Sequence, residues 1–147
     1  MHRAQQIFDA AYELVSARVT ASGVKVFKHH RQFLDEEQDE LPAISVDYGT
    51  DDPADGTLGD YHSVITLETV AQASAPTAEE LHEKLLELRA EIHIALRESP
   101  TLGLSFVMNT NYGPVDKPEL NTRGELFSGA LTSRWLIHYW MDLSDPN

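Results

Sequence analysis

Residues 61–96 read YHSVITLETVAQASAPTAEELHEKLLELRAEIHIAL and hold the two patterns that decide the fold. The first ten are rich in β-branched and aromatic side chains, which is typical of a β-strand. After a predicted break at residues 71–76, Thr77 and Glu80 form a capping-box pattern, which predicts that a helix begins there. Leucine and isoleucine then recur at helical spacing, so the pattern predicts a helix over residues 77–97.

The sequence before this stretch predicts one more helix and two more strands. An apolar stripe at helical spacing predicts a helix over residues 3–20, and Gly23 can follow it in the left-handed conformation. Alternating apolar and polar residues predict strands over residues 24–28 and 42–48. Residues 49–60, GTDDPADGTLGD, are rich in Gly, Asp and Pro, so we expect a long hairpin loop there.

The sequence after the second helix predicts two further strands. Residues 104–108 are expected to form a short strand. Residues 109–123 contain a Gly-Pro pair and a second proline, which predicts a loop. Residues 125–141 are long and aromatic enough for a final strand, in which alternation places Trp135 on one face and Trp140 on the other.

The predicted order is therefore α-β-β-β-α-β-β. Helices segregated from meandering strands indicate an α+β fold, with two helices packed on one face of a mainly antiparallel sheet. The chain has 147 residues, a length that suits one domain over residues 1–147 and is sufficient for a real core.

The negative charge is concentrated in the middle of the chain. The formal net charge is -13, and 14 of the 24 acidic residues lie within residues 32–83, where there is no Lys or Arg. Residues 29–40 are expected to form a polar, acidic loop. A strongly negative field repels phosphates, so tight or sequence-specific binding of nucleic acid is not expected.

The composition also excludes several kinds of chemistry. The chain has no Cys, and so it has no disulfide framework, thiolate metal site or cysteine nucleophile. No stretch approaches the roughly 20 apolar residues that a membrane span needs. Acidic residues interrupt the N-terminal apolar pattern, which argues against a signal peptide. We therefore expect a soluble protein made in the cytoplasm, with no membrane partner.

No motif predicts catalysis or a cofactor. Seven histidines are present, but none forms an HExxH pattern, and scattered surface histidines are the expected reading. The DDPADG turn partly mimics a calcium loop, yet Pro53 occupies its third position and His62 the position of the bidentate acid, so a true EF-hand is rejected. A weak divalent-ion site among Asp51, Asp52 and Asp55 stays open as an alternative to a solvated acidic turn.

The final strand predicts a contact surface. Its second face carries Trp140 outward, where it is covered either by the chain's own loops or by another subunit. The near-neutral ends of the chain carry Arg123 and Arg134, so a head-to-tail contact with an acidic patch of a second copy is available. With these we predict Tyr112 and Phe127 at a subunit or tube interface.

The chain resembles the tail terminator and minor tail protein family of long-tailed bacteriophages, typified by the lambda U protein. The likeness covers most of the chain. It lies in the first helix and in the segments ELPAISVDYG, TDDPADG, YHSVITLETV, TAEELHEKLLELRAEIHIAL and SGALTSRWLIHYW. It implies a structural protein, not an enzyme. Such a protein forms a ring, usually of six subunits, that caps the tail tube, stops tube growth and presents a surface to the neck of the head.

The resemblance also implies partners and a location. The partners would be further copies in a homo-hexameric ring, the tail tube protein and a head-completion or neck protein, in a virion tail assembled in the host cytoplasm. DNA would pass through the channel without specific binding, and the acidic residues Asp51, Asp52 and Asp55 are expected to face it. The predicted loops at residues 49–60 and 109–123 are expected to contact the tube or a neighbouring subunit.

Two other functions stay open at this point. A head–tail connector or neck protein would also form a ring. A small dimeric α+β metal-dependent enzyme or ligand-binding module would instead use the carboxylates of Asp51, Asp52 and Asp55.

Overall fold

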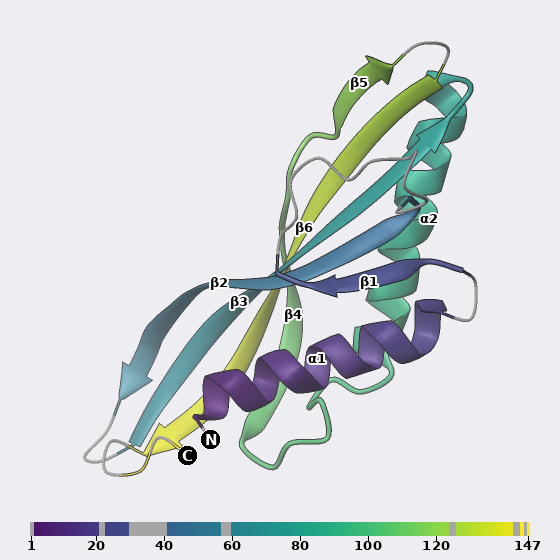
Figure 1. Cartoon of the computed structure of the whole chain (residues 1–147). Helices are drawn as coiled ribbons and strands as arrows, with labels where there is room; N and C mark the ends of the chain where they lie inside the picture. The colour runs from purple at the N-terminus through teal and green to yellow at the C-terminus, as the bar shows by residue number, and fades with distance from the viewer. Residues whose placement is uncertain are drawn as a thin grey trace.

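The computed structural model shows two helices on one face of a twisted sheet (Figure 1). It describes residues 2–20, 23–29, 41–56, 60–123, 126–142, 145 and 147, without the side chains of residues 54–56, 60, 61 and 123. In chain order the elements are α1 (Arg3–Val19), β1 (Lys25–Lys28), β2 (Ala43–Gly56), β3 (Asp60–Ala75), α2 (Ala78–Arg97), β4 (Val107–Val115), β5 (Glu119–Arg123) and β6 (Leu126–Asp142). The predicted α+β fold is confirmed, with one strand more than expected.

The ends of both helices follow the sequence signals. Thr77 caps α2, because its hydroxyl accepts a hydrogen bond from the backbone N–H of Glu80 at 3.2 Å. The imidazole Nδ1 of His2 accepts from the N–H of Ala4 at 3.0 Å at the start of α1. Gly23, just after α1, has φ +83°, which is the left-handed conformation predicted for it.

The strands form one mixed sheet in the order β1-β2-β3-β6-β4. Only the pairing of β1 with β2 is parallel in the described sheet, and the other pairings are antiparallel. The centre is the long pairing of β3 with β6, from Asp60 opposite Asp142 to Ala75 opposite Phe127. Strand β5 pairs with the first part of β6 on the same side as β4.

The core lies between this sheet and the two helices. Trp135, Ile137 and Tyr139 of β6 are at most 3% exposed, as the predicted alternation requires. The indole N–H of Trp135 donates to the hydroxyl of Thr69 at 3.0 Å, which satisfies a buried donor. Helix α1 packs on β1 and β2, and α2 packs on β3 and β6. We call the opposite face of the sheet the outer face.

The predicted loop at residues 49–60 is wrong at every described position, residues 57–59 lying outside the described part, and the predicted break at residues 71–76 is wrong as far as Ala75. Strand β2 continues to Gly56, and β3 begins at Asp60 and ends at Ala75. Beyond Val46, β2 pairs within the described sheet only with β3, so this part of β2 is an edge. An edge strand tolerates Pro53, and two register shifts in this pairing absorb the irregular residues.

The predicted loop at residues 109–123 is also wrong, because it contains most of β4 and all of β5. Both are edge strands, where Gly, Pro and Asn are tolerated. A register shift between Tyr112 and Val115 takes up Gly113 and Pro114. A Cβ on Gly113 would lie 3.1 Å from the backbone oxygen of Arg134, a tight contact, so the close approach of β4 to β6 favours glycine here.

One sequence expectation falls mostly outside the described residues. The acidic loop predicted at residues 29–40 is described only at His29. Within the described parts, no helix combines the length and the apolar character needed to cross a bilayer.

Candidate assembly surface

Large apolar side chains are exposed mainly along one edge of the sheet, which we call the apolar edge. Its members are Tyr112 (58% exposed), Leu120 (48%), Trp140 (45%), Val115 (39%) and Met108 (37%). They lie on β4, β5 and the end of β6. These side chains line the length of this edge on both faces of the sheet, since Tyr112 lies opposite Trp135 on the helix face and Trp140 is on the outer face. A monomer seldom leaves so many large apolar side chains exposed without a partner. The apolar edge is therefore the candidate site for a protein partner.

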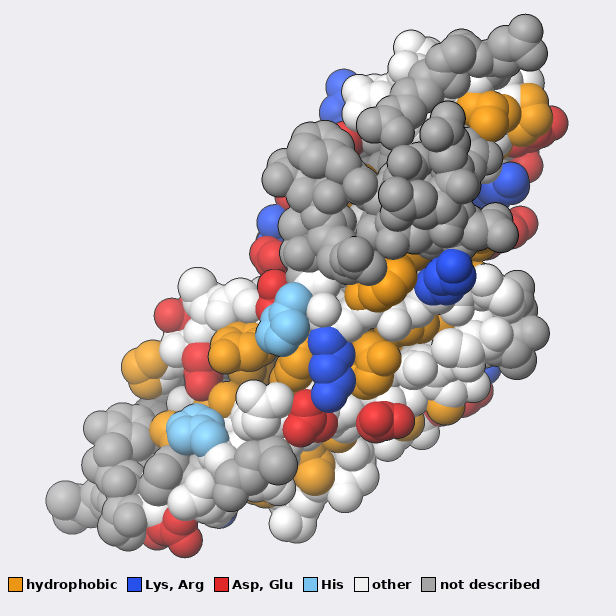
Figure 2. All heavy atoms as spheres, viewed as in Figure 1, with side chains coloured by type: hydrophobic (Ala, Val, Ile, Leu, Met, Phe, Trp, Pro, Cys, Tyr) orange, Lys and Arg blue, Asp and Glu red, His pale blue; other side chains and the backbone are white. Residues whose placement is uncertain are grey.

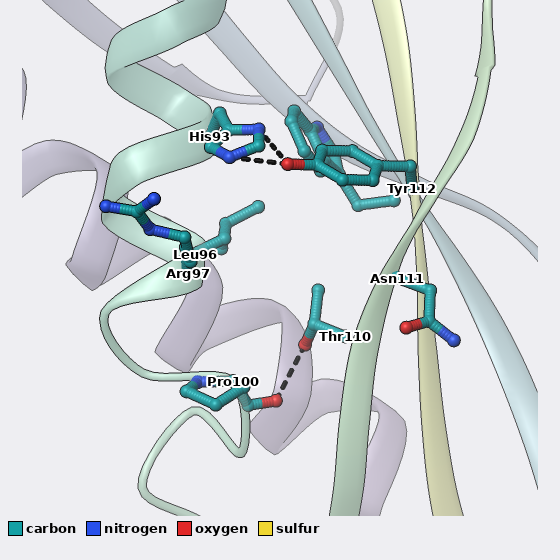
Figure 3. A pocket seen from close by; sticks show the side chains of 8 residues that line it. His93, Leu96, Arg97, Pro100, Thr110, Asn111 and Tyr112 are labelled. Atoms are coloured by element: carbon teal, nitrogen blue, oxygen red, sulfur yellow. Dashed lines mark hydrogen bonds between the residues drawn. The ribbon is translucent and has the colours of Figure 1, made fainter.

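A pocket of about 330 Å³ opens beside the apolar edge, between the end of α2 and β4 (Figure 3). The Tyr112 hydroxyl is hydrogen-bonded to the His93 imidazole, and the two rings stack with centroids 4.7 Å apart. At the other end the Thr110 hydroxyl donates to the carbonyl of Pro100 at 2.9 Å. The lining consists of His93, Leu96, Arg97, Pro100, Thr110, Asn111, Tyr112 and Trp135.

The chemistry of this pocket favours binding over catalysis. Its lining contains no carboxylate, thiol or amine, and its one aliphatic hydroxyl is bound to a backbone carbonyl. Arg97 is exposed and forms no ion pair with the described residues. The rings of Tyr112 and Trp135 belong to this lining together with Arg97. Such a pocket suits a partner protein that inserts an apolar side chain and has an acidic residue beside it.

Five residues were predicted at a subunit or tube interface, and the structure describes the side chains of four of them. These four lie in different environments. Tyr112 and Trp140 lie on the apolar edge. Phe127 is partly buried and packs against the core, on the same face of β6 as Trp135, and its place at an interface stays a prediction. The side chain of Arg123 lies outside the described part.

Arg134 is engaged within the chain. Its guanidinium donates two hydrogen bonds to the Asp116 carboxylate, at 2.8 and 3.1 Å, and one to Glu68 at 3.2 Å. The hydrogen bond from Arg134 lowers the pKa of the Asp116 carboxyl, and the same pairing raises the pKa of Arg134. An acidic group from another subunit would have to compete with both carboxylates for this cation.

The acidic residues predicted to face a channel do not act as one cluster. The Asp51 carboxylate accepts a hydrogen bond from the Tyr139 hydroxyl at 2.6 Å, on the helix face. Asp52 pairs in register with Val64 on the outer face. Asp55 lies on the same strand, but its side chain is outside the described part. Figure 2 shows acidic side chains on the visible face along β2, and the opposite orientations of Asp51 and Asp52 place carboxylates on both faces of this strand.

Sequence reasoning missed a pair of histidines on the outer face. Nε2 of His62 and Nδ1 of His138 are 2.9 Å apart, although 76 positions separate the two residues in the sequence. Burial, and to a smaller extent the neighbouring His62, lower the pKa of His138. The pair depends on the register of β3 with β6, which no sequence motif reveals.

Comparison with known proteins finds a distant structural likeness and no match to the sequence. No family model and no curated protein match the sequence. Among solved structures, a chain of the virion of a native gene transfer agent particle is similar to this one, with 13% identity over 88% of this chain and 92% of that chain. The TM-score is 0.44. A likeness at this level carries no conclusion about this chain.

Proposed function

We propose that this protein is a structural component of a phage-like virion, and specifically a tail terminator. In this proposal copies of the chain form a ring, usually of six, that caps the tail tube, stops its growth and offers a surface to the head or neck. The sequence resemblance supports the family. The observation that carries the proposal is the contrast between the two edges of the sheet.

A ring requires head-to-tail contacts, in which one patch meets a different patch on the next copy. The free edge of β2 carries Asp51 and Asp52 on its two faces. The apolar edge lies on the opposite side of the sheet, in the order β1-β2-β3-β6-β4. It has the exposed cations Arg97 and Lys117 near it, and neither forms an ion pair with the described residues. The two edges are therefore unlike and complementary in charge.

The arrangement of the acids favours assembly over the metal-dependent enzyme. That alternative needs Asp51, Asp52 and Asp55 to converge on one ion. Asp51 and Asp52 point to opposite faces of β2, and Asp51 is already bound to Tyr139. The pocket beside the apolar edge has no general base of the carboxylate type.

Of the acidic residues predicted to face a DNA channel, Asp51 is bonded to Tyr139, and the channel proposal rests on the other two. Asp52 and Asp55 would face the DNA path, where negative charge keeps the surface from binding phosphates. Reversing these charges, as in Asp52→Lys with Asp55→Lys, is expected to slow DNA passage and lower phage yield. An unchanged yield from particles that carry the variant would show that these acids are only solvated.

The mass of the protein in solution tests the main proposal. Light scattering after size exclusion, with negative-stain images of the same fraction, is expected to show closed rings with a central hole, alone or on addition of tube protein. A compact monomer or dimer under all salt conditions, with no effect on tube length in a polymerisation assay, would refute it. A ring that binds neck protein but leaves tube growth unchanged would favour the connector alternative.

A further inference from the structure

Two histidines from distant parts of the chain meet on the outer face. His62 lies on β3 and His138 on β6, in diagonal positions, because the register pairs His62 with Trp140 and Val64 with His138. Nε2 of His62 and Nδ1 of His138 are 2.9 Å apart, at hydrogen-bonding distance. The two imidazole nitrogens therefore face each other as donor and acceptor of one hydrogen bond.

The spacing of the two rings also fits a metal ion held between them. Zn–N bonds of about 2.05 Å at a tetrahedral angle place two imidazole centroids about 5.2 Å apart. The centroids of His62 and His138 are 5.1 Å apart. Binding of an ion would replace the present hydrogen bond and open the distance between the two nitrogens from 2.9 Å to about 3.3 Å, with little change in the distance between the ring centroids.

Two side-chain amides on β4 can support such an ion. Asn111 Nδ2 lies 3.4 Å from Nε2 of His138, and Asn109 Nδ2 donates to Asn111 Oδ1 at 3.0 Å. An amide presents its oxygen where its nitrogen was after half a turn. When Nδ1 of His138 binds an ion, the turned Asn111 can accept the Nε2–H, which is the support that metal-bound histidines usually have. Asn109 then turns as well, so that its oxygen accepts from the Asn111 amide.

The local charge state suits a cation. The neutral imidazole is the form of histidine that binds a metal ion. The formal charge of -13 also raises the local concentration of cations around the chain.

We propose that His62 and His138 form a binding site for a divalent transition-metal ion such as Zn²⁺, with water in the remaining coordination positions. Imidazole ligands favour Zn²⁺, Cu²⁺ and Ni²⁺ over Mg²⁺ and Ca²⁺. Among the described residues no group of three or more His, Asp or Glu is placed to hold a metal, so the two imidazoles would be the only side-chain ligands from this part of the chain. This inference does not depend on the proposed ring.

Calorimetric titration with ZnCl₂ at pH 7.5 tests the site. We expect one ion per chain in the wild type, and at least tenfold weaker binding in His62→Gln and in His138→Gln. His82→Gln is the matched control, because His82 is an exposed histidine on α2 outside the pair. Asn111→Leu should weaken binding about tenfold, as expected for a positioning residue. Thermal melts of the metal-free variants check that each one folds.

A second readout uses Trp140, whose ring lies 5.6 Å from that of His62. Cu²⁺ bound at the pair should quench Trp140 fluorescence, and Trp140→Phe should remove most of the quenching because Trp135 is buried on the other face. No Zn²⁺ binding by the folded wild type, or equal binding by the two histidine variants and His82→Gln, would overturn the proposal. A loss of binding in Asp52→Asn as large as in His62→Gln would assign the ion to the acidic edge of β2 and overturn it too.

Discussion

The hydroxyl of Tyr139 donates a 2.6 Å hydrogen bond to the carboxylate of Asp51, and so joins the buried face of β6 to the acidic edge of β2. Strand β3 lies between these two strands. The bond fixes one of the predicted channel-facing acids on the helix face, while its neighbour Asp52 lies on the outer face. Burial, and then the bond to Asp51, raise the pKa of Tyr139 above its ordinary value of 10.0.

This shift predicts a loss of stability in alkali. Because the folded protein favours neutral Tyr139, its contribution to stability is complete below the unfolded pKa of 10.0 and falls as the pH rises above it. Urea denaturation should show that Tyr139→Phe is about 1 kcal/mol less stable than the wild type at pH 8. The difference should shrink above pH 10. Tyr48→Phe, at an exposed tyrosine, is the control, and parallel pH profiles for all three proteins would contradict the assignment.

For His138 the stability of the fold should fall toward acidic pH, opposite to the effect of Tyr139. The pKa of His138 is lowered from 6.5 by burial and then by His62, so unfolding takes up a proton and stability should fall as the pH drops below 6.5. His138→Gln should show a smaller loss of stability than the wild type between neutral pH and about pH 5. Denaturation midpoints against pH measure this, with His82→Gln as control. An identical acid slope in wild type and His138→Gln would disprove the coupling.

Gly129 allows β5 to lie close to β6. A Cβ at this position would come within 2.7 Å of the backbone oxygen of Glu119, a contact that a flexible side chain cannot relieve. Gly129→Ala should therefore destabilise the protein by about 1–3 kcal/mol, as overpacking does. Gly49→Ala is a matched control in another strand, since its nearest neighbours would be 3.8 Å away. Equal melting temperatures for both variants would show that β5 moves freely.

The apolar edge should be needed for assembly but not for folding. Tyr112→Gln and Leu120→Gln are expected to reduce ring formation strongly in light scattering and negative-stain images, with small changes in melting temperature, because both side chains are exposed. Leu86→Gln removes an equally exposed leucine from α2 and serves as the control. If rings form equally well in all three variants, the contact between copies lies elsewhere.

Salt or divalent cations should favour the ring. Each chain carries a formal charge of -13, and counterions shorten the range of the repulsion from about 10 Å at 0.1 M to about 3 Å at 1 M. Size exclusion at low and high ionic strength, with and without MgCl₂, should show a higher ring fraction under screening. A ring fraction that neither salt nor MgCl₂ changes would remove repulsion as a control on assembly.

The elements that pack on the core could be predicted from the sequence, and the edges could not. Burial imposes a period, which the sequence repeats over many residues in the apolar stripe of α2 and in the alternation around Trp135. The Thr77 cap adds a local signal for the start of α2. Strands β4 and β5 and the end of β2 have few such constraints. Their Gly, Pro and Asn residues look like loop residues, although an edge strand tolerates them.

Site residues whose position depends on one strand alone could be predicted from the sequence. Contacts that depend on how two strands pair could not. The outward position of Trp140 followed from alternation along one strand. The same alternation places Phe127 on the face of Trp135, because it is eight residues before Trp135, and its place at an interface stays a prediction. The His62–His138 pair and the pairing of Arg134 with Glu68 require the register of β3 with β6, which is a property of the folded sheet.

The contrast between the apolar edge and the acidic edge of β2 also gives any closed assembly a direction. When the apolar edge of one copy contacts the acidic edge of the next, all copies have the same orientation relative to the ring axis. The two rims of the ring therefore differ. One rim could then match the last layer of a growing polymer while the other offers that polymer nothing to add to. A single small chain would in this way supply both a stop signal and a new docking platform.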